Sequence, residues 1–362
     1  MNKETDADAQ LPVVNRIFSY DVIRVVAILA VVMIHCSVSF VKSYNPPSIE
    51  FFAGNLFNSI SAMAIQLFVM ISGVFMLNRN RVLNIDNLVK KIIKLFMLFI
   101  IWAVVYASLY HSNKFLSGVF YGHYHLWFLL MLIGLYLITP ILRLFVKPEN
   151  KQYLYYFVVL SCIFQFIPVI IDLFLDQGDA AVKYSNMFYL DFVGGFVSYY
   201  ILGWLIAEDF EKFKRYKTFI CLAGVCSISI IFIGCELLTS SSCRAYKTLY
   251  SSLSFPMFVY SFSVFVFLKD FAEQIENRLA LNFKNLVFRL AALSLGVYLI
   301  HPMVLESVKR NLLKNIFAVT PQNANPFVYI LILFLITTVV SFIFTYLISK
   351  VPYLKKIVKL KN

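Results

Sequence analysis

Apolar segments of about twenty residues recur along the whole chain, and they limit the folds it can adopt. Of its 362 residues, 60% are hydrophobic and 14% are charged, whereas about a quarter of the residues in an ordinary soluble domain are charged. A soluble fold of this length has too small an interior to bury so many apolar side chains. Because a hydrocarbon core about 30 Å thick needs about twenty helical residues, these segments predict membrane-spanning helices.

The number and spacing of the segments predict an all-α polytopic membrane bundle of about ten transmembrane helices. The connecting segments are short, and we expect one transmembrane domain, residues 17–349, between two tails, residues 1–16 and 350–362. The polar N-terminal tail lacks the features of a signal peptide, so we expect the first span to be retained. The predicted spans are 17–40, 52–77, 92–111, 124–142, 153–171, 189–208, 218–238, 248–268, 290–308 and 327–349.

The positions of the lysines and arginines predict the orientation of this bundle. With a cytoplasmic N-terminus, three quarters of the 32 Lys and Arg residues fall on the cytoplasmic side, as the positive-inside rule requires. Ten spans then place both termini in the cytoplasm. The same bias accounts for the net charge of +13 without nucleic acid, and it predicts contacts with membrane lipid and with anionic cytosolic ligands.

Two ionisable residues, Arg24 and His35, lie inside the first apolar segment. Their separation is about three helical turns, so they share one face of the helix about 16 Å apart. Charged residues cost about 2.5–3.5 kcal/mol at the bilayer centre on insertion scales, and they mark buried sites or aqueous pathways. Histidine exchanges a proton near neutral pH and is a suitable base for a hydroxyl group. Asp21 is placed to form an i,i+3 ion pair with Arg24.

Two further histidines, His125 and His301, are predicted at a membrane depth similar to that of His35. His125 opens the fourth predicted span, and His301 lies past the middle of the ninth. Each alone fits a structural histidine bonded to a backbone carbonyl, but the shared depth favours a common site. We expect catalytic roles for His35, Arg24 and His301, and substrate contacts for His125, Trp127 and Tyr298.

Basic residues gather on the predicted cytoplasmic side, around the loop between the second and third spans. Lys91 and Lys94 are one helical turn apart and can contact the same anion. The plainer interpretation of this cluster is a topology signal. As a ligand site it fits a phosphate-rich molecule such as coenzyme A, bound by Arg79, Arg81, Lys91 and Lys94.

The six cysteines show no spacing typical of metal ligands, and we predict no metal site. Most of them fall inside predicted spans, where cysteine behaves as a small apolar residue. Cys235 and Cys243 lie near the predicted outer face and are candidates for a disulfide.

Several motifs resemble the integral-membrane acyltransferase 3 family over essentially the whole chain. The Arg24-to-His35 spacing is the most specific of them, and their order and predicted depth agree with the family. The chain is most similar to the branch of surface-polysaccharide O-acetyltransferases that includes the enterobacterial common antigen O-acetyltransferase. The motifs are Asp21-x-x-Arg24, Val32-Met33-Ile34-His35, Phe68-x-x-Ile71-Ser72-Gly73, His125-Leu126-Trp127-Phe128 and Tyr298-Leu299-Ile300-His301-Pro302.

The resemblance implies a multi-pass enzyme of the bacterial plasma (inner) membrane that uses acyl-CoA, expected to be acetyl-CoA, as donor substrate without a tightly bound cofactor. The implied acceptor is a hydroxyl of an envelope glycan or lipid-linked saccharide. Arg24 and His35 match the family's helix-one pair. Lys91 and Lys94 stand where the family often has Arg-x-x-Arg, and lysine lacks the bidentate fork. Some relatives carry an acid in the last helix, which is missing from residues 327–349; Glu306 is a candidate substitute.

Two other functions fit the same residues. In a proton-coupled transporter or a lipid-linked glycan flippase, Arg24 and His35 would belong to a proton relay or a headgroup path. Transporters often contain inverted repeats with helices broken at matching positions, and the prolines show no such paired pattern. A sensor or assembly subunit would bind lipid at its basic cluster and would not bind coenzyme A.

Overall fold

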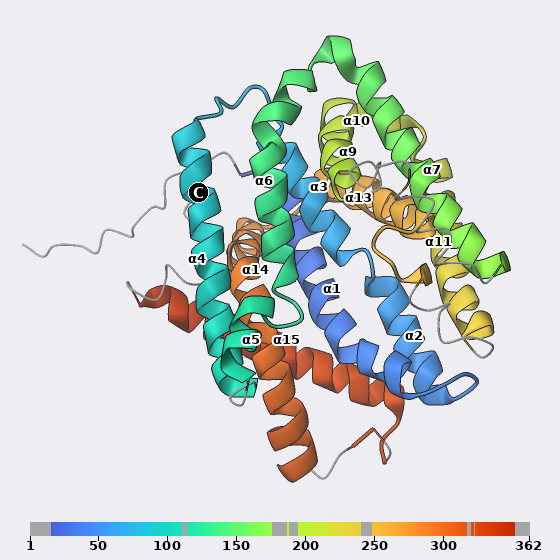
Figure 1. Ribbon diagram of the computed structural model, residues 1–362, viewed down its shortest axis with the longest axis vertical. Coiled ribbons are helices and arrows are strands. Elements are labelled where there is room, and N and C mark those ends of the chain that lie inside the picture. The colour runs from blue at the N-terminus through green and yellow to red at the C-terminus, as the bar shows by residue number, and fades with distance from the viewer. Residues whose placement is uncertain are drawn as a thin grey trace, which may run out of the picture.

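The computed structural model describes residues 16–110, 114–175, 195–239, 248–316 and 320–351, Gln322 excepted, together with Met187. This part of the chain is built from helices and contains no strand, which confirms the predicted all-α bundle (Figure 1). Nearly all of both predicted tails, and Cys243 of the candidate disulfide, lie outside the described residues.

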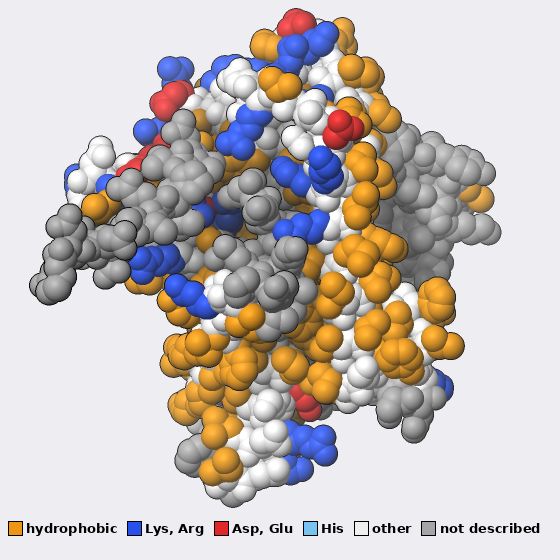
Figure 2. Space-filling view, turned by 90° about the vertical axis from the view of Figure 1, so that its left-hand side faces the viewer, with side chains coloured by type: hydrophobic (Ala, Val, Ile, Leu, Met, Phe, Trp, Pro, Cys, Tyr) orange, Lys and Arg blue, Asp and Glu red, His pale blue; other side chains and the backbone are white. Residues whose placement is uncertain are grey.

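Eight helical segments of the described chain are long and apolar enough to cross a membrane. Figure 2 shows hydrophobic side chains covering the middle of one face, with most of the basic side chains above them and a smaller basic group at the lower end. Large apolar residues such as Phe96, Leu137 and Leu335 are exposed on helices of this set, as expected for lipid-facing positions. The eight segments are α1 (Phe18–Ser43), α2 with α3 (Ile49–Ser61 and Ala64–Met76), α4 (Ile85–Tyr110), α6 (Trp127–Phe145), α11 (Lys217–Leu238), α13 (Phe255–Glu276), α14 with the π-helix η3 (Leu281–Ser307 and Val308–Ile316) and α15 (Pro326–Lys350).

Each of these eight segments overlaps one predicted span. The fifth predicted span falls on α7 (Lys151–Leu175), and the sixth ends in a shorter apolar helix, α9 (Val197–Glu208). Residues 188–194, where the sixth span would begin, lie outside the described residues. A total of ten spans and the cytoplasmic position of the termini therefore stay predictions. The remaining described elements are α5 (Phe115–Tyr121), the 3-10 turn η2 (Pro148–Asn150) and α10 (Phe210–Arg215).

Several helices begin at other residues than hydropathy predicts, and capping explains two of these differences. The α13 helix begins at Phe255 instead of 248, because the Ser254 side chain accepts a hydrogen bond from the amide of Met257 and Pro256 occupies the first turn. The α4 helix begins seven residues early, where the Asn84 side chain accepts from the amide of Asn87. The polar first turn of α4 therefore belongs to the helix although it lies outside the apolar segment.

The α1 helix is central to the bundle, since it packs against α2, α3, α13, α14 and α15. The second span is interrupted at Ala62 and Met63, between α2 and α3. Beside this interruption the Tyr260 hydroxyl of α13 donates to the carbonyl of Ile60, at 2.8 Å. The side-chain donor satisfies a backbone acceptor where the helix is broken, which is how membrane helices tolerate such breaks.

Glycines allow α3 and α9 to pack with their backbones in contact. A Cβ atom on Gly73 would lie 1.8 Å from the carbonyl oxygen of Tyr200, and one on Gly203 would lie 2.1 Å from the carbonyl oxygen of Met70. Small residues at helix crossings are a common means of association in membranes. The glycine of the Phe68-x-x-Ile71-Ser72-Gly73 motif is therefore a packing position.

We predict that Gly73→Ala lowers the free energy of unfolding of the purified protein by about 1–3 kcal/mol or more. The added methyl group meets backbone atoms, which cannot rotate away as a side chain can. The matched control is Gly134→Ala on α6, where an added Cβ has no neighbour within 4 Å. Alanine is also the better helix former. Thermal unfolding in detergent should therefore separate the two variants; equal melting temperatures would contradict the close packing of α3 on α9.

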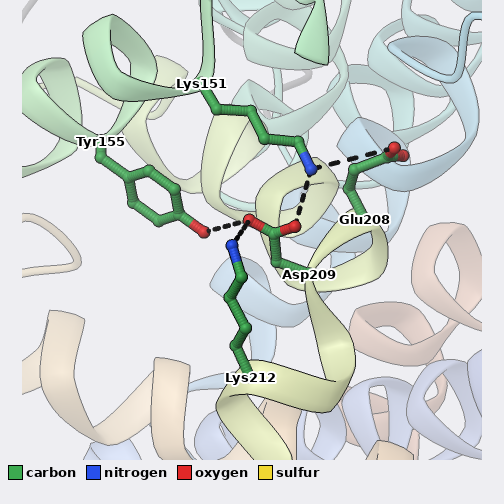
Figure 3. A network of polar contacts seen from close by, with 5 residues as sticks. All are labelled: Lys151, Tyr155, Glu208, Asp209 and Lys212. Carbon is green, nitrogen blue, oxygen red and sulfur yellow. Dashed lines mark hydrogen bonds and ion pairs between the residues drawn. The ribbon is translucent and has the colours of Figure 1, made fainter. Parts of the chain in front are cut away.

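An ion-pair network joins α7 to the segment between α9 and α10 (Figure 3). Asp209 accepts from Lys151 at 2.6 Å, from the Tyr155 hydroxyl at 2.9 Å and from Lys212 at 3.3 Å. Burial alone would raise the pKa of Asp209, but the hydrogen bonds from Lys151 and Tyr155 outweigh it and hold the pKa below its ordinary value. The carboxylate therefore stays ionised at neutral pH and fastens this end of α7 to α9.

Candidate functional site

Four of the five histidines of the chain lie together: His35 on α1, His301 on α14, and His123 and His125 in the turn before α6. The ring centroids of His35 and His301 are 5.0 Å apart, those of His125 and His301 are 5.6 Å apart, and those of His123 and His125 are 5.1 Å apart. The structure thus brings together His35, His125 and His301, which the sequence placed at a similar depth. We call these four residues the histidine cluster.

The turn that carries two of the four histidines is shaped by Gly122 and held by Tyr298. Gly122 follows α5 with a φ of +68°, a left-handed conformation that glycine adopts without strain. The amide of Leu126 then donates to the carbonyl of His123 at 2.8 Å, which closes the turn. The Tyr298 hydroxyl of α14 donates to the carbonyl of His125. Because this hydrogen bond occupies the Tyr298 hydroxyl hydrogen, we interpret Tyr298 as a residue that positions His125.

Backbone carbonyls determine which nitrogen of His301 carries the hydrogen. The Nδ1 atom lies 2.8 Å from the carbonyl oxygen of Tyr298 and 3.1 Å from that of Val297. Carbonyl oxygens only accept, so Nδ1 is the protonated nitrogen and Nε2 carries the lone pair. His301 is fully buried, and its Nε2 atom has no hydrogen-bond partner among the described residues. The ring therefore offers a buried basic nitrogen beside His35. Glu306 is exposed, and its candidate role as the acid that orients His35 stays a prediction.

His123 is a member of the cluster that the sequence analysis did not identify. Its Nδ1 atom lies 3.0 Å from Nδ1 of His125, so one of the two nitrogens donates and the other accepts. Its ring stacks on Tyr106 of α4 with centroids 4.3 Å apart, and the Tyr106 hydroxyl donates to the carbonyl of Leu299 at 2.8 Å. Two histidines separated by one residue, directly after a glycine, were the available signal in the sequence.

A second group of residues lies near the other end of α1, around the ring of Phe75. Arg24 donates to Asp21 at 2.6 Å, which confirms the predicted i,i+3 ion pair. The guanidinium carbons of Arg24 and Arg81 each lie 4.9 Å from the centroid of the Phe75 ring, so they are within about 10 Å of each other. We call Asp21, Arg24, Phe75 and Arg81 the arginine cluster. Its two cations face a single carboxylate, which favours the binding of an anion.

Arg143 of α6 fixes the loop that carries Arg81. From the sequence, Arg143 counted only as one of the basic residues that orient the bundle in the membrane. Its guanidinium donates to the carbonyls of Asn78 and Arg81, at 2.9 Å and 2.6 Å. Within the loop, the amide of Asn80 donates to the Asn78 side chain at 2.9 Å. These bonds hold the backbone of Arg81 in place, so its side chain is presented to Phe75 from a fixed position.

The other predicted site residues lie outside these two clusters. Lys91 and Lys94 lie in the first turns of α4, which packs mainly on α5 and α6. Lys91 is exposed although Leu88 and Leu95, three and four residues away on the same helix face, are buried. Arg79 is also exposed. Their contact with the same ligand as the arginine cluster stays a prediction.

Trp127, predicted to contact the substrate, lies on another face of α6 from the one that meets the cluster. Its side chain is 41% exposed and packs against Phe196, with ring centroids 5.8 Å apart. The next residue, Phe128, is the one that reaches Tyr298, at 5.5 Å between centroids. Successive helical residues point about 100° apart, which separates these two rings.

Taken together, α1 connects the histidine cluster to the arginine cluster across about three helical turns. Such a pair of clusters is suited to a reaction in which an anionic group is anchored at one point while a proton is removed at another.

Comparison with known proteins identifies the family of the chain. A family model described as an acyltransferase domain, that of the acyltransferase 3 family, matches residues 17–346, which include all eight long apolar helical segments except the last few residues of α15. No curated protein and no solved structure matches the chain. The match covers most of the sequence and includes both clusters, so the chain belongs to the acyltransferase 3 family of membrane proteins.

Proposed function

We propose that this membrane acyltransferase moves an acyl group, expected to be acetyl, from cytoplasmic acyl-CoA to a hydroxyl of a cell-surface or envelope glycan. The observation that carries the proposal is that α1 holds His35 against His301 of α14 and also carries Arg24 of the arginine cluster. A hydroxyl is a weak nucleophile and needs a base, whereas coenzyme A carries phosphates that need cations. One helix provides both at a fixed separation.

In the proposed complex the arginine cluster binds the phosphates of the donor. Arg24 keeps about a third of its side chain exposed while bonded to Asp21, so it can accept a further anionic partner. Arg81, Arg79, Lys91 and Lys94 add positive charge at the same end of the bundle. The pantetheine arm of coenzyme A, extended along α1, is long enough to bring the thioester to His35.

At the histidine cluster, a nitrogen of His35 removes the proton of the acceptor hydroxyl. The oxygen attacks the thioester carbonyl, the carbon–sulfur bond breaks, and His35 returns its proton to the departing thiolate. The products are an ester and free coenzyme A, and no proton is gained or lost overall. The bare Nε2 of His301 lies on the adjacent ring, where it can accept a hydrogen bond from the acceptor hydroxyl and so orient it. The alternative, in which His35 carries the acyl group itself, predicts an acyl-histidine when donor is supplied without acceptor.

The proposal is tested with purified protein in proteoliposomes, radiolabelled acetyl-CoA and an envelope glycan extract. Acyltransfer predicts label in the glycan and an equal amount of free coenzyme A. A transporter or flippase predicts neither product, even when the glycan itself crosses the membrane. Coenzyme A release without labelled glycan would also reject the proposed acceptor.

We predict that Arg24→Gln raises the KM for acyl-CoA by about 10- to 100-fold, because a charge-assisted phosphate contact contributes about 1.5–3 kcal/mol. The matched control is Arg16→Gln, which removes another arginine near the same end of α1. Arg16 lies 5.7 Å from the Phe288 ring centroid and donates to the Phe288 carbonyl, away from the arginine cluster. Initial rates at varied donor concentration separate the two variants. An unchanged donor KM in Arg24→Gln would remove Arg24 from the donor site.

A further inference from the structure

A cation lies about one helical turn beyond the histidine cluster, on the side away from the arginine cluster. Lys309 is the second residue of η3, which directly follows α14. Its ammonium donates to the Ser39 hydroxyl of α1 at 3.4 Å. Ser39 follows His35 by four residues, which is one turn or about 6 Å along α1. Since His35 contacts His301 and Ser39 contacts Lys309, the paired helices α1 and α14 place this ammonium next in line after the two imidazoles.

Lys309 forms no ion pair within the described part of the chain, and Glu306 acts on its charge only from beyond ion-pair distance. Its side chain is half-buried, and within the described part of the chain no carboxylate oxygen lies within ion-pair distance of it. Glu306, one turn earlier, is exposed. Partial burial of an ammonium is unfavourable unless a partner compensates for the lost hydration, and one hydroxyl at 3.4 Å compensates little.

The position of this charge along the chain also needs an explanation. Lys309, Arg310 and Lys314 lie within one short element at the end predicted to face away from the cytoplasm, where the positive-inside rule disfavours lysine and arginine. These three residues therefore run against the orientation signal instead of adding to it. Arg310 and Lys314 are exposed and accessible to solvent or lipid headgroups, whereas Lys309 alone is turned onto α1.

We propose that Lys309 binds an anionic group of the acceptor, a carboxylate of an acidic sugar or a phosphate ester, and thereby holds the acceptor hydroxyl at the histidine cluster. The proposal rests on the proposed function for the identity of the ligand as an acceptor. It adds the chemical class of that acceptor: an anionic glycan instead of a neutral one. Lysine is suited to this task because its ammonium acts as a point charge for either anion.

The test measures binding without donor, so that it is independent of acyl transfer. The melting temperature of the full-length protein in neutral detergent is followed against glucuronate, glucose 6-phosphate and glucose at matched ionic strength. We expect one or both anions, but not glucose, to stabilise the unmodified protein. The apparent affinity for the anion should be at least tenfold weaker in Lys309→Gln and should be retained in Lys309→Arg. The anion that stabilises more strongly identifies the class. The matched control, Lys314→Gln, removes an exposed cation of the same element and should bind as the unmodified protein does.

Three results would overturn the proposal: no stabilisation by either anion, equal stabilisation of Lys309→Gln, or stabilisation only by anionic phosphatidylglycerol vesicles, which would assign Lys309 to lipid. Failure of acyl transfer in the proteoliposome assay, with Lys309-dependent anion binding intact, would instead reject the proposed function and leave an anion site on this face.

Discussion

Replacing His35 by alanine should reduce acyl transfer by about 10²- to 10⁴-fold, the range that a positioned general base contributes. His35 is the member of the histidine cluster that shares a helix face with Arg24, so it lies closest to the path expected for the donor thioester. Truncation at Cβ removes the only imidazole on α1. The rate is measured as label transferred to the glycan at saturating donor and acceptor concentrations.

The matched control for this prediction is Ser37→Ala. Ser37 is fully buried on the same helix two residues away, and its hydroxyl only donates to backbone carbonyls of α1, at 2.9 Å from Met33. This variant should transfer at the unmodified rate. Gel filtration and melting temperature in detergent establish that both variants are folded. A folded His35→Ala protein that transfers at the rate of Ser37→Ala would reject His35 as the base.

The sequence was sufficient to predict the architecture, because the bilayer imposes a strict length and composition on every spanning helix. It also predicted that His35, His125 and His301 would lie at one depth, since depth follows from position within a span. The predicted start of a helix differs from the observed one where a capping side chain sets the first residue, as at Ser254. Hydropathy does not detect side-chain hydrogen bonds at helix ends.

Contacts between distant segments were beyond the sequence. His123 stands in a turn whose course depends on Gly122 and on a hydrogen bond from Tyr298, which is 173 residues away from His125. Arg143 was interpreted as an orientation signal, and only the folded chain brings it to the carbonyls of the loop that carries Arg81. In each case a helix side chain donates to a backbone carbonyl of a distant turn or loop. A single sequence does not show how its helices are aligned with such segments.

Removing the imidazole of His301 should have an effect close in size to that of removing His35, although no reaction step is assigned to His301 alone. The carbonyls of Val297 and Tyr298 hold its hydrogen on Nδ1, so the ring faces its neighbours only as an acceptor. His301→Phe keeps a ring of similar volume in this fully buried position and removes the accepting nitrogen. We expect transfer to fall by about 10²-fold or more, with the melting temperature nearly unchanged.

The double variant, His35→Ala with His301→Phe, distinguishes a cooperating pair from two separate contributions. Groups that act as a unit show strongly non-additive losses, because the second removal has nothing left to disrupt. The rings lie 5.0 Å apart between centroids, which is close enough for one to orient the other or a shared hydroxyl. We therefore expect the double variant to be no slower than His35→Ala alone. If the two losses instead multiply, His301 acts independently of His35, and its buried Nε2 then belongs to acceptor binding, which a rise in acceptor KM for His301→Phe would show.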